Sequence, residues 1–200
     1  MNPAGLRIAF IVSSFMAGLL ARDAHAQKVL VTYYSLTGHT RTMAEAVARG
    51  ARTQAGAEVR LLPIDSASEA DLRWADAIIV GSPVQMASVA VPVMQAIGKW
   101  PFRRLGDKIA AAFVTGGGIS SGEELTQVQL LHVLLMEGLI VVGGPEWSDA
   151  FGASGITAEK PFLDEKNTGA VDSMFLAKGE ALGKRVAAVA RSFAAGQPAR

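Results

Sequence analysis

The sequence predicts an α/β fold, a three-layer sandwich in which five parallel strands form one sheet between two layers of helices. Short apolar runs of strand length alternate with longer segments whose apolar residues recur at helical spacing. The run AIIV at 77–80 is apolar without interruption, as in a parallel sheet covered on both faces. Such alternation implies right-handed crossovers between the strands. The ligand site of such a sheet lies in the loops at the carboxyl ends of its strands.

The expected strands are short and are bounded by turn residues. The first, KVLVTYY, is rich in β-branched and aromatic residues, and Pro63 closes the second. A Gly- or Ser-containing loop follows each of the later strands. The five strands are expected at residues 28–34, 58–62, 77–80, 108–115 and 139–142.

Four helices are expected between and after these strands. Gly56 ends the first helix, and Pro92 lies in the first turn of the second, where its missing N–H is tolerated. Residues 143–169 are rich in Gly, Pro and Ser without clear periodicity and read as a loop. The helices are expected at residues 42–55, 89–97, 123–137 and 171–193.

The first 26 residues have the pattern of a secretory signal peptide. Arg7 gives a positive start, residues 8–21 are an apolar run, and Ala24-His25-Ala26 is a small-x-small cleavage sequence. We therefore expect cleavage before Gln27, a single domain over 27–200, and a periplasmic or secreted protein. The alternative is an uncleaved anchor, but the apolar run is shorter than the roughly 20 residues that a spanning helix needs.

Composition excludes several classes of function. The chain's 19 basic and 18 acidic residues become 17 and 17 once Arg7, Arg22 and Asp23 are removed, which argues against a nucleic-acid or anionic-membrane binder. Cysteine is absent, so disulfides, thiol redox chemistry and thiolate metal sites are not available. His132 has no second ligand at metal spacing, and no metal site is expected. Any redox activity must come from a bound cofactor.

The loop after the first strand has the chemistry of a phosphate site. Hydroxyls, exposed amides and the positive end of a helix dipole bind a phosphate dianion without a lysine. The simpler alternative is a Ser/Thr cap at the start of the helix. The loop lacks the patterns of an ATP-binding P-loop and of a dinucleotide fingerprint. Its residues are Ser35, Leu36, Thr37, Gly38, His39 and Thr40.

The loop after the third strand could border a flat heteroaromatic ring. Pro83 fixes the backbone, and the amides and side chains of Val84, Gln85 and Met86 could bond the polar rim of such a ring. In isolation, a loop that leads into a helix capped by Ser88 is an equally good interpretation.

The loop after the fourth strand is rich in glycine. Thr115, Gly116, Gly117 and Gly118 let the backbone approach a ligand closely and present several N–H groups to it. Such amides stabilise negative charge that develops on a reduced ring, by the logic of an oxyanion hole. The alternative is a flexible loop without a ligand.

Four segments, VTYYSLTGHTRTMAEAVARGA, ADAIIVGSPV, FVTGGG and EGLIVVG, resemble the WrbA-type NAD(P)H:quinone oxidoreductases of the flavodoxin-like superfamily. The resemblance covers most of residues 28–142. It implies strand order 2-1-3-4-5 and FMN bound by the three loops, with NAD(P)H as co-substrate and a quinone as acceptor. It also implies that Trp100 lies near the flavin as a substrate contact. The flavin then carries the chemistry, and no catalytic acid or base is needed.

The chain departs from that family at identifiable positions. Relatives usually have an aromatic residue where Thr37 stands and a histidine where Met136 and Glu137 stand, and a longer segment where this chain has residues 64–75. The tetramer of these relatives therefore cannot be assumed, although a homo-oligomer stays open. Two other functions stay open: a flavodoxin-type electron carrier fed by a protein partner, and a flavodoxin-fold binding protein without flavin.

Overall fold

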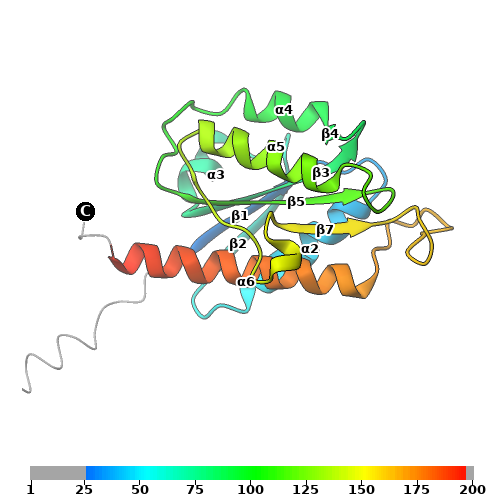
Figure 1. The fold of residues 1–200 in the computed structure, drawn as a ribbon. Helices are drawn as coiled ribbons and strands as arrows, with labels where there is room; N and C mark the ends of the chain where they lie inside the picture. The colour runs from blue at the N-terminus through cyan, green and yellow to red at the C-terminus, as the bar shows by residue number, and fades with distance from the viewer. Residues whose placement is uncertain (1–25, 197–200) are drawn as a thin grey trace, which may run out of the picture.

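Residues 26–196 are described by the computed structural model, which has a parallel sheet between two layers of helices (Figure 1). The central strands are β1 (Lys28–Tyr33), β3 (Ala77–Gln85) and β5 (Ile109–Gly116), with β2 (Glu58–Pro63) on the outer side of β1. The order is β2-β1-β3-β5-β6, and every pair along this path is parallel. The fold class and the strand order along the sheet are therefore as predicted.

The number of strands differs from the prediction, because the sheet has seven rather than five. Two of them share the fifth position: β6 (Ile140–Val141) pairs with the start of β5, and β7 (Ala153–Ile156) pairs with its end. Between them the chain leaves the sheet and forms the 3₁₀ turn η1 (Trp147–Asp149). The segment 143–169, expected to be a loop, thus contains a strand. Four residues are too few to show a period in sequence.

The remaining strand, β4 (Ser88–Val89), is antiparallel to the end of β3. The third strand therefore runs five residues beyond its predicted end and turns back on itself as a hairpin. A uniformly apolar run marks only the part of a strand that is buried on both faces, and β3 becomes half-buried from Pro83 onward.

The helices divide between the two faces of the sheet. Helices α2 (His39–Arg52) and α6 (Ser173–Gly196) pack on one face, and α3 (Glu69–Trp74), α4 (Val91–Ile97) and α5 (Glu123–Met136) lie on the other (Figure 1). Helix α3 was not predicted, because six residues are too short to show helical periodicity. Ser68 and Asp71 close it with a reciprocal capping box.

Helices α2 and α6 cross at two glycines. A Cβ atom on Gly50 would overlap the carbonyl oxygen of Glu180, and one on Gly183 would overlap the carbonyl oxygen of Val47. The absence of side chains therefore sets how closely the two backbones approach. This contact fixes the second half of α2 against α6, while the start of α2 belongs to the predicted phosphate loop.

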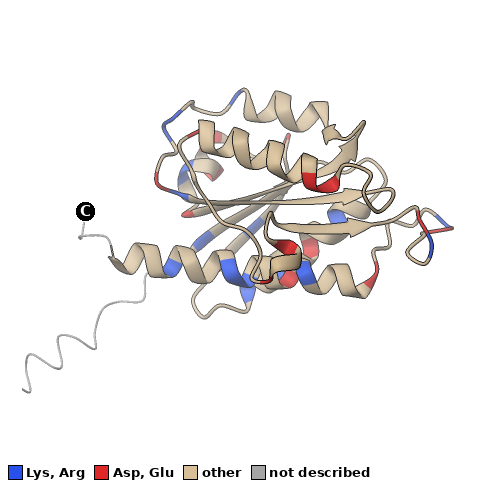
Figure 2. Ribbon diagram, in the orientation of Figure 1, with Lys and Arg blue, Asp and Glu red and all other residues tan. Residues whose placement is uncertain are grey.

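The predicted signal peptide, residues 1–26, lies outside the described residues except for its last position. Within residues 26–196, none of the helices has the length and apolar character needed to cross a membrane. Lysine, arginine and the two acidic residue types are interspersed over the visible helices and loops (Figure 2).

Candidate functional site

The three predicted loops meet at one edge of the sheet, because β1, β3 and β5 are adjacent and parallel. Tyr34 donates its amide to the carbonyl of Gly81, 3.1 Å away, which ties the first loop to β3. The Thr40 and Thr115 hydroxyls are 2.7 Å apart and buried, which ties the start of α2 to the end of β5. The Thr40 hydroxyl thus joins two of the predicted loops.

The loop after β1 keeps the features of an anion site. Helix α2 begins after Gly38, whose φ is 97°, and no side chain caps it at that position. The Ser35 hydroxyl oxygen accepts the amides of Gly38 and Arg41 at 3.2 Å each and thereby holds the loop in a tight turn. Because the first amides of a helix have no intrahelical acceptor, those of His39 and Thr40 suit an anion at the positive end of the helix dipole.

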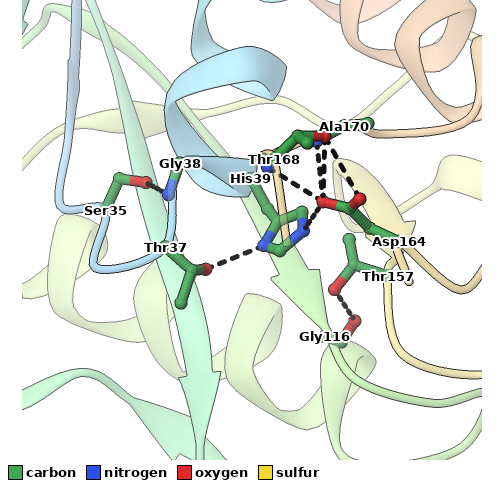
Figure 3. A network of polar contacts seen from close by, with 10 residues as sticks. Ser35, Thr37, Gly38, His39, Gly116, Thr157, Asp164, Thr168 and Ala170 are labelled. Carbon is green, nitrogen blue, oxygen red and sulfur yellow. Dashed lines mark hydrogen bonds and ion pairs between the residues drawn. The ribbon is translucent and has the colours of Figure 1, made fainter. Parts of the chain in front are cut away.

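His39 links this loop to a carboxylate that sequence reasoning missed. Its Nδ1 lies 2.7 Å from the Thr37 hydroxyl, and its Nε2 lies 3.0 Å from Asp164 (Figure 3). Both side chains of this hydrogen-bonded pair are nearly buried, with exposed fractions of 11% for His39 and 6% for Asp164. Asp164 lies in the segment without periodicity, where sequence offers no signal for a contact across 125 positions.

Asp164 has more partners than His39. Its carboxylate accepts the amides of Gly169 and Ala170 at 2.9 and 3.1 Å, and the Thr168 hydroxyl at 3.2 Å (Figure 3). Burial alone would raise the pKa of the Asp164 carboxyl. The hydrogen bonds from His39, from the two amides and from Thr168 outweigh burial, so this pKa lies below its ordinary value. The group is therefore a carboxylate at neutral pH.

Residues 157–170, which we call the strap, join the phosphate loop to the glycine loop. At one end the Thr157 amide and hydroxyl both donate to the carbonyl of Gly116, and the Ala158 amide donates to that of Gly117. At the other end Asp164 holds His39. The strap thus continues the pairing of β7 with β5 and then crosses to α2.

The strap and the phosphate loop also touch through two glycines in left-handed conformations. Gly38 and Gly169 have φ of 97° and 82°, and a Cβ atom on Gly38 would lie 3.1 Å from the Cα of Gly169. Side chains are disfavoured at both positions, because the conformation and the close approach both penalise a Cβ. The shape of the phosphate loop therefore depends on a contact with distant sequence.

The loop after β3 is the β3–β4 hairpin. Val84 pairs with Val89 and Gln85 with Ser88, so Met86 and Ala87 occupy the turn, with φ of 51° and 56°. Met86 is 99% exposed at the tip. Gln129 of α5 accepts the Ser88 hydroxyl and the Val89 amide at 2.9 Å each, which fixes the hairpin on α5. Helix α4 begins after Ala90, so the alternative of a Ser88 cap is wrong.

The glycine loop keeps Thr115 and Gly116 in β5, while several later amides already have acceptors. Ile119 donates to Glu159 at 2.7 Å, and Ser120 and Ser121 donate to the Glu123 carboxylate at 2.8 and 2.9 Å. The amides that remain for a ligand are therefore those of Gly117 and Gly118. Fewer amides of this loop are available than the sequence predicted. A Cβ on Gly116 would touch Val84, so the hairpin and this loop are close neighbours.

Trp100 does not join these loops. It is only 7% exposed and packs in the core beneath α4 with Ile97 and Leu105. It follows α4, which carries the chain from the carboxyl edge of the sheet back toward the start of β5. The structure thus shows Trp100 as a core residue of this chain, and its role as a substrate contact stays a prediction.

Comparisons with known proteins agree on the family. Residues 66–154 match the NADPH-dependent FMN reductase family. A flavodoxin of Aquifex aeolicus is 37% identical over 156 residues, 70% of this chain and 78% of that protein. An NAD(P)H dehydrogenase (quinone) of Methylocella silvestris is 38% identical over 140 residues, 58% of this chain and 70% of that protein. The crystal structure of a flavodoxin, WrbA-like protein from Agrobacterium tumefaciens has a TM-score of 0.63 at 25% identity, over 84% of this chain and 99% of that one.

The chain belongs to the flavodoxin-like family of WrbA type. The solution structure of Megasphaera elsdenii flavodoxin, at 20% identity and a TM-score of 0.57, has the same fold over 80% of this chain and 98% of that one. The family match covers the hairpin, the glycine loop and the first half of β7, whereas the strap lies beyond it. The contact between Asp164 and His39 is therefore a feature that only the tertiary structure reveals.

The residues of this family member fit FMN. The His39 and Thr40 amides at the start of α2 and the Thr37 hydroxyl suit its phosphate, and the amides of Gly117 and Gly118 lie at the adjacent edge. The hairpin of β3 and β4 lies beside the glycine loop, with Val84 next to Gly116. A flat ring would lie against these two neighbouring loops. The residues at this edge of the sheet thus form one site with two parts, one suited to the phosphate and one suited to the flavin ring.

Proposed function

We propose that this protein is an FMN-dependent NAD(P)H dehydrogenase (quinone). The observation that carries the proposal is the meeting of three loops at one carboxyl edge, with the uncapped start of α2 at one end and the hairpin and glycine loop at the other. The named relatives and the NADPH-dependent FMN reductase match support the same activity. FMN, when bound, would supply the two-electron chemistry between NAD(P)H and a quinone.

The chain's own residues bind and orient rather than transfer protons. The amides at the start of α2 would hold the phosphate, while Val84 and Gly116 limit the space available to the ring. Positioning of this kind is the main protein contribution in a cofactor enzyme. The two carboxylates that cap the glycine loop, Glu123 and Glu159, place negative charge close to the ring end.

The test is a titration of purified protein with FMN, followed by steady-state assays. We expect a shift in the visible flavin spectrum on binding, and oxidation of NADH or NADPH that requires both FMN and a quinone. A protein that binds FMN and never oxidises either nicotinamide in the presence of a quinone lacks the proposed activity. A protein without any spectral change or shift in melting temperature is instead a flavin-free binding protein.

An electron carrier is the second candidate, and the flavodoxin of Aquifex aeolicus at 37% identity favours it. A carrier passes single electrons between protein partners, so a redox titration should resolve two separate one-electron steps. A dehydrogenase should show a single two-electron step. The number of steps therefore separates the two candidates on the same sample.

We propose further that residues 1–26 are a Sec-type signal peptide and that the mature protein acts in the periplasm or outside the cell. The pattern of Arg7, the apolar run and Ala24-His25-Ala26 supports this. Intact-mass measurement of protein recovered from the periplasmic fraction should give a chain that begins at Gln27. Retention of Met1 in cytoplasmic protein only would contradict export.

A homo-oligomer is proposed from the exposed apolar residues of the hairpin and α5. Met86, Leu125, Leu135 and Met136 are all at least half exposed on these neighbouring elements. Exposed apolar side chains on neighbouring elements favour an interface with another copy of the chain. Light scattering coupled to size exclusion should give a mass above that of one chain, and a monomer at micromolar concentration would contradict it.

A further inference from the structure

Three side chains form a continuous series of contacts from the strap to the phosphate loop. The Asp164 carboxylate lies 3.0 Å from His39 Nε2, and His39 Nδ1 lies 2.7 Å from the Thr37 hydroxyl oxygen (Figure 3). Asp164 is itself fixed by the Gly169 and Ala170 amides. The carboxylate therefore cannot turn away from the imidazole without losing several hydrogen bonds.

This series determines which way the Thr37 hydroxyl can donate. An ionised Asp164 only accepts, so the proton on His39 Nε2 points to it. In the neutral imidazole Nδ1 is then an acceptor, and the Thr37 hydroxyl must donate to it. In the charged imidazolium Nδ1 donates to the Thr37 oxygen, and the Thr37 hydrogen is free to donate to another acceptor.

We propose that Asp164 is a positioning residue for the cofactor phosphate: acting through a protonated His39, it leaves the Thr37 hydroxyl free to donate to a phosphate dianion, so that the dianion and one proton bind together. The inference rests on the proposed FMN site. Asp164 does not touch the phosphate; it stabilises the imidazolium and holds its orientation. The phosphate gains a hydrogen-bond donor and a nearby positive charge.

The other charged groups around this series are accounted for. On α2, Arg41 is paired with Glu45 at 3.0 Å. On the strap, Lys160, Glu165 and Lys166 are exposed, and the Glu159 carboxylate accepts the Ile119 amide. On α5, Glu123 holds the Ser120 and Ser121 amides. Asp164 is therefore the carboxylate that pairs with His39 within residues 26–196.

The first experiment compares FMN with riboflavin, which has the same ring and no phosphate. Dissociation constants are measured by flavin fluorescence for the wild-type chain and for Asp164→Asn, which keeps the shape of the side chain and removes its charge. We expect Asp164→Asn to weaken FMN binding about tenfold and to change riboflavin binding less than twofold, an effect of ~1.4 kcal/mol on the phosphate alone. Glu165→Gln removes the same charge from the exposed neighbouring position and should leave both constants unchanged.

The second experiment measures proton uptake. At pH 8 a phosphate monoester with a second pKa near 6 is already a dianion, so a proton gained on binding belongs to the protein. Calorimetric titration with FMN in buffers of different ionisation enthalpy should show uptake by the wild-type chain and by Glu165→Gln. It should show none for Asp164→Asn or His39→Gln, and none with riboflavin.

A double-mutant cycle completes the design. Thr37→Val removes the hydroxyl that the series orients but leaves the His39–Asp164 contact, so Asp164→Asn should have a smaller effect on FMN affinity in that background than in the wild-type chain, and an equal effect would contradict the role of Thr37. Equal losses for FMN and riboflavin, or absence of proton uptake by the wild-type chain, would overturn the inference while the FMN site stands. Absence of any FMN binding by the wild-type chain would overturn the inference and the proposed function together.

Discussion

Asp164 and His39 are 125 positions apart in the chain, and their side chains meet at 3.0 Å. This contact joins the strap to the phosphate loop, and Gly38 and Gly169 pack against each other beside it. The loop that would hold the cofactor phosphate is therefore shaped by residues from both ends of the domain. Four further predictions follow from the contacts around this site and from the fold that supports it.

Replacement of Thr115 by valine should destabilise the protein through Thr40. The two hydroxyls are 2.7 Å apart and buried, so Thr115→Val leaves the Thr40 hydroxyl without this partner. An unpaired buried hydroxyl costs about 1–3 kcal/mol. Chemical denaturation should show that loss. The double variant Thr40→Val, Thr115→Val should lose less than the sum of the two single variants, and strict additivity would contradict coupling between the hydroxyls.

Replacement of Gly50 by alanine should destabilise the α2–α6 contact. Alanine favours a helix over glycine by about 1 kcal/mol, but here its Cβ would overlap the Glu180 carbonyl oxygen and force the two helices apart. We expect a net loss of roughly 1–3 kcal/mol in the free energy of unfolding. Gly196→Ala is the matched control, since nothing lies within 4 Å of a Cβ there. Equal melting temperatures for the two variants would contradict this account of the helix packing.

Replacement of Met86 by asparagine should stabilise the β3–β4 hairpin. Met86 has a φ of 51° and a side chain that is 99% exposed, so it contributes little packing within one chain. A left-handed conformation costs an ordinary side chain roughly 1–2 kcal/mol, and asparagine tolerates it better in a two-residue turn. Melting temperature in the absence of flavin should rise. A fall would show that Met86 packs against another copy or another element.

Acid should weaken the contact between β2 and α3 through Asp71. Hydrogen bonds from the Ser68 hydroxyl and amide, together with the Arg60 guanidinium, lower the pKa of Asp71 below its ordinary 3.8. The unfolded chain therefore binds this proton more readily than the folded chain. The stabilisation is present above pH 3.8 and is lost as the pH falls through the lowered pKa of the folded state.

The measurement is the free energy of unfolding between pH 5 and pH 2 for the wild type and for Asp71→Asn. The variant should be less stable at pH 5 and should lose less stability on acidification. Glu58→Gln removes an exposed carboxylate on β2, the strand that carries Arg60, and controls for the change in net charge. Parallel curves for wild type and Asp71→Asn would show that Asp71 does not contribute to the acid sensitivity.

The long elements were predictable because each carries its own signal. Helix α5 begins at Glu123 as expected, and the strand at β5 differs from its predicted range by one residue at each end. Short elements were not predictable: α3, β4 and β7 have six, two and four residues. Elements of that length form when the surrounding fold supplies partners, so their own sequence contains too few positions to show a period.

The residues of the candidate site also divide into those that follow long, predictable strands and those that lie in short or irregular segments. Ser35 to Thr40 and Gly116 to Gly118 follow strands whose ends could be placed from sequence, so their meeting at one edge followed from the parallel order. The hairpin at Pro83 to Met86 was predicted as a loop, because its antiparallel partner has only two residues. Trp100 was assigned by resemblance and is a core residue of this chain. Glu159 and Asp164 were missed, since both lie in a stretch without periodicity.

The order of the central strands was expected from the resemblance to a known family. The sequence by itself determined the fold class and the residue types of the predicted phosphate loop after β1. These follow from hydrophobic periodicity and from local residue types, which act over a few residues along the chain. The tertiary structure alone decided that the strap crosses the site and that Asp164 pairs with His39. Contacts between residues 125 positions apart depend on how the whole sheet and its helices pack, and no local pattern records them.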